Sequence, residues 1–462
     1  MSISLNVALA QSALTSQHHR KVAEILHKNN RGEGIKEGLP TLSAEQIINK
    51  SLSQSGFEHS LRPQDGTEVT YAFNGGKNAQ SPTFSDTQKN RIRADIEHFS
   101  DVAKLKFKES AMASSHHIQL KVDSSRFDWK DPYYVSTKNG APGGVDVPLL
   151  QRHAAELEQP NSYGSHVIAK ALAFKLGLPA AGSGGGPRRY HENTLAYTLR
   201  SPYSEGRSGQ RFGKEHISNA YPSTPMMDDI ALLQKKYGAN HETRAGDTTY
   251  GFNSNTGRET FTLKSDADLP VFCAWDGGGK DTFDFSEFTQ NQIINLNQAS
   301  FSNVGGGVGN VSIAQGVLIE RAIGGKGENI IIGNEANNEL VGGPSSDILY
   351  VNANSGFNKL WGGDGRNIFV IGASEQSAKL ENTAIMDFVS GKDKLDLSAL
   401  RAASNQPNIK VVNKYTGRGG EVTIDYFESH KLSMLRFDIN GDGKMDCMVT
   451  VTGRIEPRDI IV

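Results

Sequence analysis

Side-chain oxygens recur at a regular spacing in the second half of the chain, and such oxygens suit a hard cation like Ca²⁺. The segment IGGKGENIIIGNEANNELVGGPSSDILY repeats with a nine-residue period of glycines, a polar residue at the sixth position and then apolar residues. The segment WGGDGRNIFV adds one more copy. This pattern predicts a parallel β-roll, in which each repeat combines a calcium-binding loop with a short strand. The sixth-position residues are Asn329, Asn338, Asp347, Asn358 and Asn367.

Only one sixth-position residue, Asp347, carries a charge. Asparagine keeps a carbonyl oxygen for Ca²⁺ but lacks the negative charge, and calcium affinity depends on the charge count of the ligands. The copy YVNANSGFNKL is also two residues too long and lacks its glycine pair. We therefore expect fewer or weaker calcium ions than in a roll with aspartates here, with stacked amides bonding from turn to turn instead.

The segment DINGDGKMD near the end of the chain places oxygens at positions 1, 3, 5 and 9 of an EF-hand loop, with Gly443 at position 6. These oxygens belong to Asp438, Asn440, Asp442 and Asp446. Position 12, which needs a glutamate, is Val449 and offers no side-chain oxygen. The favoured interpretation is a polar hairpin turn between two strands, and a calcium loop is the alternative.

Composition excludes several classes of protein. The chain has 462 residues and a formal net charge of −2 without a sizeable block of like charge, so nothing supports a nucleic-acid partner. No apolar stretch approaches the roughly 20 residues of a membrane span, and the N-terminus lacks the basic region of a cleaved signal peptide. The two cysteines, Cys273 and Cys447, exclude a disulfide framework and are predicted to be buried thiols.

The elements that position these residues change in type near residue 240. Helical spacing predicts helices within residues 1–40 and at 42–53, 83–103, 163–178 and 226–237, and alternation predicts strands at 68–73, 104–110 and 117–123. Beyond residue 245, short strands lie between glycines. The sequence thus predicts an α+β multidomain chain, with an α/β domain followed by a parallel β-roll.

Long segments along nearly the whole chain resemble the serralysins, secreted bacterial zinc proteases of the metzincin group. The segments are ILHKNNRGEGI, PMMDDIALLQKKYGAN, GDTTYGFNSNTGR, AWDGGGKDTFDFS, NVSIAQGVLIERAIGG and DFVSGKDKLDLS. The resemblance implies an N-terminal pro-segment at 1–35, a metzincin-like domain at 36–240 and a calcium-binding β-roll domain at 241–462. The last residues, 459–462, resemble the family's signal for a type I exporter, which implies an extracellular protein.

The family's zinc motif, HExxHxxGxxH, does not appear on the corresponding helix. Two anchors, Tyr163-Gly164 and Leu176-Gly177-Leu178, fix the register. The ligands, the general base, the Met of the Met-turn and the Tyr ligand are then replaced by Lys170, Ala171, Phe174, Ala180, Arg200 and Pro202. Alanine and phenylalanine offer no donor atom, and a lysine ammonium repels a divalent cation. We therefore expect no zinc site and no enzyme activity.

Two further expectations concern this helix. His153, His166, His191 and Glu192 could rebuild a zinc site, but their spacing favours surface or hydrogen-bonded side chains. We expect the Lys170 ammonium to occupy the space of the zinc, with Phe174 filling volume beside it. A buried ammonium needs a carboxylate or several acceptors, so an exposed Lys170 without a partner would contradict this expectation.

The resemblance also implies a pair of calcium ions where the roll begins. The first would take oxygens from Arg244, Gly246, Thr248, Asp276, Gly278 and Asp281. The second would share Gly279 and Asp281 with Glu320. These segments keep the family's residue types.

The leading hypothesis is a secreted, catalytically inactive serralysin-like monomer that acts by binding, with a virulence factor or toxin as a subtype. Its partner would be an inhibitor of the active sister protease, a host protein, or a peptide bound by strand addition. One alternative is an active zinc metalloendopeptidase with unconventional ligands. Another is a structural calcium-binding β-roll protein at the cell surface.

Overall fold

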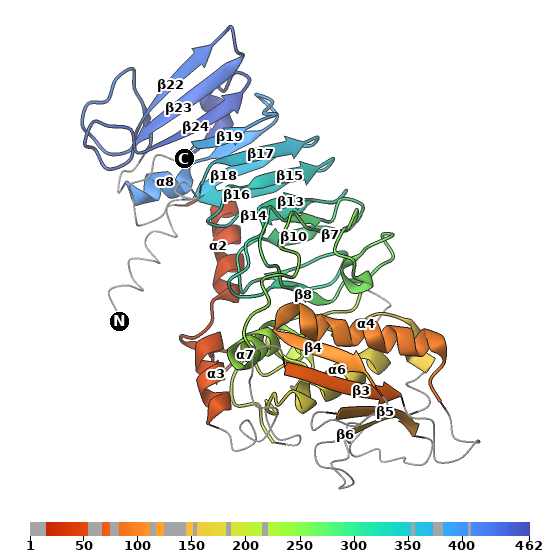
Figure 1. The fold of residues 1–462 in the computed structure, drawn as a ribbon. Coiled ribbons are helices and arrows are strands. Elements are labelled where there is room, and N and C mark those ends of the chain that lie inside the picture. The colour runs from red at the N-terminus through yellow and green to blue at the C-terminus, as the bar shows by residue number, and fades with distance from the viewer. Residues whose placement is uncertain are drawn as a thin grey trace.

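The computed structural model describes residues 15–53, 67–73, 83–110, 117–123, 145–150, 155–181, 186–214, 220–352, 356–372, 382–404 and 408–462. Helices and a four-stranded sheet make up the first half, and short strands stack along the second half (Figure 1). No described helix is long and apolar enough to cross a membrane. Cys273 and Cys447 are free and buried, as predicted.

The first half is built around a parallel sheet in the order β4-β3-β5-β6. Its strands are β3 (Thr67–Phe73), β4 (Leu105–Glu109), β5 (His117–Asp123) and β6 (Val145–Leu150). The helices are α3 (Ala44–Leu52), α4 (Asp86–Val102), α6 (Tyr163–Lys175) and α7 (Met227–Tyr237). Helix α4 packs on β4 and on α6, which also contacts β6 (Figure 1).

Local signals account for these helices. Ser85 caps α4 in a capping box with Gln88, and the apolar face of α4 is buried in the core. Ser43 and Gln46 form the same box at α3. The helices predicted at 42–53, 83–103, 163–178 and 226–237 are therefore confirmed.

The N-terminal helix α2 (Gln17–Asn29) lies against the strands of the second half (Figure 1). Its Val22 is fully buried among Ile330, Ile332, Tyr350 and Val370. The chain then passes the small hairpin of β1 (Ile35–Lys36) and β2 (Leu39–Pro40). The earlier part of the helix predicted within residues 1–40, at 5–14, lies outside the described residues.

The second half is a roll with two large sheets, in which the strands from β13 to β20 pair in parallel and alternate between the two sheets. The ten-stranded sheet runs β21-β22-β23-β24-β19-β17-β15-β13-β9-β7 and the six-stranded sheet runs β10-β14-β16-β18-β20-β25. The roll strands are β7 (Thr249–Gly251), β9 (Thr282–Asp284), β10 (Gln292–Asn295), β13 (Arg321–Ile323), β14 (Asn329–Ile332), β15 (Glu339–Gly343), β16 (Ile348–Asn352), β17 (Asn358–Gly363), β18 (Ile368–Gly372), β19 (Asn382–Ile385) and β20 (Lys394–Asp396). One coil of the roll thus consists of two nine-residue repeats.

Other elements lie at both ends of the roll. A three-stranded sheet of β8 (Phe272–Ala274), β11 (Phe301–Ser302) and β12 (Val311–Ile313) lies at its start. At its end come α8 (Ser398–Ala403), β21 (Lys410–Val411), β22 (Glu421–Phe427), β23 (Leu432–Asp438), β24 (Cys447–Thr452) and β25 (Ile460–Ile461). The apolar side chains of the roll join those of the first half in one large core, so the two halves are packed together.

Candidate functional site

Helix α6 is fixed at both ends by its own sequence. The Ser162 hydroxyl accepts a hydrogen bond from the Ser165 backbone N–H at 3.2 Å and caps the start. Gly177 has φ +84°, which allows the Leu178 N–H to donate to the Ala173 carbonyl at 3.0 Å. This arrangement ends the helix with a Schellman motif. Lys170 and Phe174, four residues apart, consequently lie on one face of α6.

The six replaced positions have different surroundings. Lys170 is only 9% exposed, and its ammonium lies 3.5 Å from the Ser201 carbonyl oxygen. Ala171 is buried and Phe174 is half-buried, whereas Ala180 and Pro202 are exposed. Lys170 is therefore buried as the sequence-based hypothesis requires, and its substitution for zinc stays a prediction.

Arg200 makes three contacts with its surroundings. Its backbone N–H donates to the Thr198 hydroxyl at 3.1 Å, and its Nε donates to the Leu178 carbonyl at 3.2 Å. Its guanidinium carbon lies 4.9 Å from the centre of the Phe174 ring, a cation–π distance. Burial lowers the pKa of Arg200 to about 10, so the side chain is charged at neutral pH.

A buried carboxylate on α7 positions the segment that carries Arg200. Asp229 accepts hydrogen bonds from the Thr198 hydroxyl and the Leu199 N–H, both at 2.7 Å, and from the Met226 N–H at 3.0 Å. Burial raises the pKa of Asp229 to about 7. The three bonds tie residues 198–200 to the start of α7, which explains why this loop keeps its shape.

The six replaced side chains do not fit a zinc ion, because two alanines, a phenylalanine and a proline offer no donor atom and the others are cations. His166 Nδ1 lies 2.9 Å from the Pro222 carbonyl, and burial together with the nearby Lys170 charge lowers its pKa to about 3. Glu192 accepts the Leu42 N–H at 2.8 Å. His153 lies outside the described residues, and within the described ranges no three His, Cys, Asp or Glu side chains converge on a metal position. The expected lack of zinc stays a prediction.

A second site lies where the roll begins, in two loops at residues 244–248 and 276–281, here called the paired loops. They precede β7 and β9, which pair in parallel, so both loops reach the same end of the sheet. Glu320 precedes β13, the next parallel strand, and lies at that same end. A Cβ at Gly279 would lie 2.5 Å from the Gly246 backbone, so this close approach requires glycine.

The paired loops gather oxygen atoms. The Thr248 hydroxyl donates to the Gly246 carbonyl at 2.9 Å and lies 3.4 Å from the Arg244 carbonyl. One Asp281 oxygen accepts the Thr248 N–H at 2.9 Å, and the other is buried without a described partner. The Asp281 N–H in turn donates to Glu320 at 2.7 Å.

Carboxyl groups outnumber cations at the paired loops. Burial, with the nearby Asp276 and Glu320 carboxylates, raises the pKa of Asp281 to about 8, and burial also raises the pKa of Asp276 and of Glu320. Asp276 accepts a hydrogen bond from the Tyr250 hydroxyl at 2.9 Å. Carboxylates mixed with backbone carbonyls are the ligands that Ca²⁺ prefers, so this donor set fits a calcium ion.

The sixth-position side chains of the roll are all buried. Asp347 accepts the Asn329 N–H at 2.7 Å and the Asn329 side-chain amide at 2.8 Å. Asn367 accepts the Asp347 N–H, and Asn358 accepts the Asn338 N–H, each at 3.0 Å. Hydrogen bonds between successive coils are thus present, although most of these side chains accept from a backbone N–H and not from another side-chain amide. The second Asp347 oxygen has no described partner, and burial raises the pKa of Asp347 to about 6.

The segment DINGDGKMD is a hairpin turn between the antiparallel strands β23 and β24. The Asp438 oxygens accept the Gly441 N–H at 2.7 Å and the Gly443 N–H at 2.9 Å, and Asp446 accepts the Ile439 N–H at 2.6 Å. The predicted hairpin is therefore confirmed.

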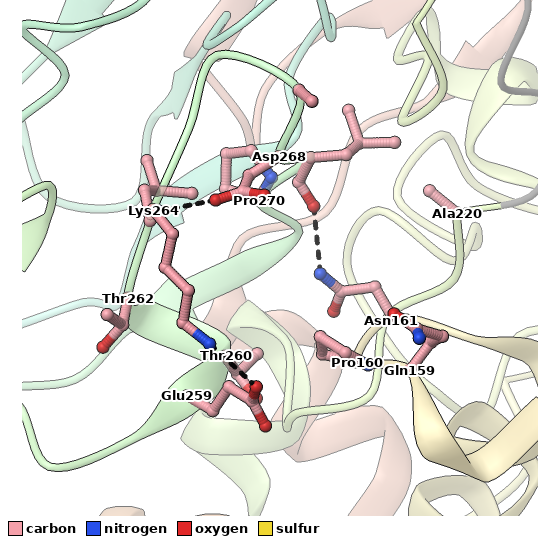
Figure 2. A pocket seen from close by; sticks show the side chains of 13 residues that line it. Gln159, Pro160, Asn161, Ala220, Glu259, Thr260, Thr262, Lys264, Asp268 and Pro270 are labelled. Carbon is pink, nitrogen blue, oxygen red and sulfur yellow. Dashed lines mark hydrogen bonds and ion pairs between the residues drawn. The ribbon is translucent and has the colours of Figure 1, made fainter.

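Sequence reasoning missed a cavity of about 340 Å³ between the two halves (Figure 2). One wall contains Asn161, whose amide donates to the Leu269 carbonyl at 3.1 Å. The other contains Glu259 and Lys264, which form an ion pair at 3.3 Å. The lining segments, near residues 160 and 265, are far apart in sequence, so no local signal could have identified them.

Sequence comparisons relate the chain to known proteins along its full length. Residues 239–462 match the family described as Peptidase M10 serralysin C terminal. The chain is 37% identical to Metallopeptidase AprA of Pseudomonas marginalis, with 100% of both chains covered. It is 34% identical to Serralysin A of Dickeya chrysanthemi, covering 98% of this chain and 97% of that one, and 38% identical to a serralysin of Photorhabdus laumondii over 79% and 77%. A solved structure titled AlgE6R2 subunit of a mannuronan C5-epimerase of Azotobacter vinelandii covers 39% of the chain, at 17% identity and a TM-score of only 0.21.

These relatives correct one prediction. All three are named as metallopeptidases or serralysins and match most or all of the chain, which points to a protease. The prediction that the chain is not an enzyme is therefore contradicted. The six replaced side chains on and near α6 remain a property of this sequence, and any mechanism must accommodate them.

Proposed function

Because the chain belongs to the serralysin family of metallopeptidases, we propose that it is exported from a bacterial cell and engages extended polypeptides outside it. The observation that carries this proposal is the 37% identity to a metallopeptidase over 100% of both chains. A match of that extent includes α6 and its neighbouring elements, where the zinc motif HExxHxxGxxH of the serralysins is expected. A host protein or a proteinaceous inhibitor of serralysins would present such a polypeptide.

Calcium is the cofactor in this proposal. The paired loops would hold it through the Asp276 and Asp281 carboxylates and carbonyls of Arg244, Gly246, Thr248 and Gly278, and a second ion would use Gly279, Asp281 and Glu320. Asp347 is the further ligand proposed within the roll. The bound cation would neutralise buried carboxylates and cross-link the ends of three neighbouring strands.

The proposed organisation has three parts, at residues 1–35, 36–240 and 241–462. Within the first part, Val22 is buried against the roll and Arg31 forms a buried ion pair with Asp228 at 2.8 Å. Loss of one partner of a buried pair is strongly destabilising. We therefore place the end of any removable segment before α2.

The proposed export signal is part of the folded structure. Asp459 is buried, accepting hydrogen bonds from the Ser390 hydroxyl at 2.6 Å and the Gly391 N–H at 2.9 Å. The next two residues form β25, which pairs with β20. A type I exporter would therefore have to read this segment before the roll folds.

The test uses the purified full chain in calcium buffer with fluorescently labelled casein fragments. Binding is measured by anisotropy, cleavage by mass spectrometry, and calcium and zinc per chain by elemental analysis. We expect saturable binding and at least one calcium ion per chain. Cleavage that stops on chelation would add metal-dependent hydrolysis, whereas a chain that neither binds nor cleaves the fragments would refute the proposed function.

A further inference from the structure

We propose that Arg200 binds a carboxylate of the polypeptide ligand, so that the protein selects acidic peptides or peptides with a free C-terminus. This inference rests on the proposed function and adds the chemical class of the ligand to it. It depends on three features of Arg200: the guanidinium is fixed, its outer nitrogens are available, and it lacks a counter-ion.

The Arg200 guanidinium is fixed by groups that are themselves held in place. Leu178, which accepts from Nε, is part of the Schellman motif that ends α6. Thr198, which accepts the Arg200 N–H, is bonded to Asp229. The Phe174 ring lies against the guanidinium, with its centre 4.9 Å from the guanidinium carbon. Such preorganisation lowers the entropy lost when a ligand binds.

The two terminal nitrogens of the guanidinium, Nη1 and Nη2, have no hydrogen-bond acceptor among the described residues, although Nε is occupied. The two terminal nitrogens form a planar fork, and this fork matches the two oxygens of a carboxylate. Arg200 therefore retains the part of its side chain that recognises carboxylates.

No carboxylate within the described ranges forms an ion pair with Arg200. The acidic group that influences it is Asp229, and both Asp229 oxygens already accept hydrogen bonds from Thr198, Leu199 and Met226. A half-buried cation without a counter-ion is unfavourable compared with a paired one. A bound carboxylate would supply that counter-ion, whereas in other buried pairs of this protein, such as Arg31 with Asp228, the chain supplies it.

The surroundings favour a carboxylate on an organic ligand over inorganic phosphate. The half-buried Phe174 ring touches the guanidinium, and Pro202, two residues away in the chain, is exposed. These groups can contact carbon atoms next to a carboxylate.

The experiment compares peptides that differ in one charged group. Casein-derived peptides with a free C-terminus are titrated against their C-terminal amides, and glutamate-containing peptides against the glutamine versions, using the full chain at pH 7. We expect the form with the carboxylate to bind about tenfold more tightly, as a charge-assisted bidentate pair warrants. Arg200→Gln should abolish this preference, and Arg200→Lys should keep only part of it because the fork is lost.

Two controls keep the outcomes separable. Arg207→Gln, at an exposed position of the nearby 3-10 helix Glu205–Ser208, should leave the preference unchanged. If Arg200→Gln does not fold, binding of the free-acid and amide peptides to the unaltered chain still tests whether a carboxylate is preferred. Equal binding of both forms would overturn this inference and leave the proposed function intact, whereas no binding of any peptide would overturn both. Displacement of the peptide by phosphate at lower concentration than by acetate would overturn the assignment to a polypeptide carboxylate.

Discussion

The paired loops and the Arg200 region are two charged sites of opposite sign, and the chain builds them differently. At the paired loops, Asp276 and Asp281 precede β9, and Glu320 precedes β13, the neighbouring parallel strand. At Arg200, a cation is placed by the end of one helix and one anchored loop. Both sites hold charge that the described residues do not neutralise. On these proposals, an unbalanced charge predicts a cation site where it is negative and an anion site where it is positive.

Removal of calcium should have the largest effect, because it exposes the repulsion among the carboxylates of the paired loops. A ligand present at a thousand times its dissociation constant stabilises the folded state by about 4 kcal/mol. We expect chelation to lower the free energy of unfolding by about that amount, measured by urea denaturation with and without EGTA.

Matched variants assign the calcium effect to the paired loops. Asp281→Asn should remove most of the response to EGTA, whereas Asp442→Asn in the C-terminal hairpin should not change it. An identical urea midpoint with and without EGTA would contradict a calcium-stabilised site in this protein.

Breaking the anchor of the Arg200 loop should have the next largest effect. Asp229→Ala leaves the Thr198 hydroxyl and the Leu199 and Met226 N–H groups without their acceptor. Unsatisfied buried donors cost about 1–3 kcal/mol each, partly relieved by water, so we expect a loss of about 3 kcal/mol in urea denaturation. Asp229→Asn keeps an acceptor and should lose less. Equal losses for the two variants would show that the hydrogen bonds do not position this loop.

The stability of the calcium-free protein should depend on pH through the carboxyl group of Asp281, which distinguishes the paired loops from the Arg200 region. The folded-state pKa of Asp281 is about 8, well above its ordinary value of 3.8. Protonated Asp281 is thus favoured by folding, and stability is lost as the pH rises from about 4 to 8. We expect the calcium-free protein to be about 2 kcal/mol less stable at pH 8 than at pH 5. One titrating group can change the free energy of unfolding by at most about 1.4 kcal/mol per pH unit, and we expect only part of that change.

Calcium should cancel this slope, because a bound cation favours the ionised carboxylates. The measurement is urea denaturation at pH 5, 6, 7 and 8, in EGTA and in calcium. A calcium-free protein that becomes more stable as the pH rises would contradict the assigned role of Asp281.

The sequence predicted what local patterns determine. The helical spacing of apolar residues, the alternation in the strands and the glycine-rich repeats led to the correct elements. The roll contained one surprise, since Asn329 bonds to Asp347, 18 residues away, and not to Asn338. Successive repeats lie in opposite sheets, so only every second sixth-position side chain is stacked, and a nine-residue period alone does not show this.

The candidate sites depend more on long-range packing. The stacking of Arg200 on Phe174 joins a loop to a helix 26 residues earlier, and the cavity near Asn161 joins segments about a hundred residues apart. No local pattern encodes such distances. The prediction that the chain is not an enzyme rested on six positions, whereas its relatives match the chain over most or all of its length.

The smallest expected effect distinguishes a ligand-binding cation from a structural one. Arg200→Leu removes the half-buried charge and keeps apolar packing against Phe174, and replacing a charge removed from water by a hydrophobic residue is often neutral or stabilising. The lost hydrogen bond to Leu178 offsets part of this gain. We therefore expect the free energy of unfolding to change by less than about 1 kcal/mol in urea denaturation, while the preference for carboxylate-bearing peptides disappears. A loss of several kcal/mol would instead show that Arg200 stabilises the fold, and the unpaired guanidinium would then need no ligand to explain it.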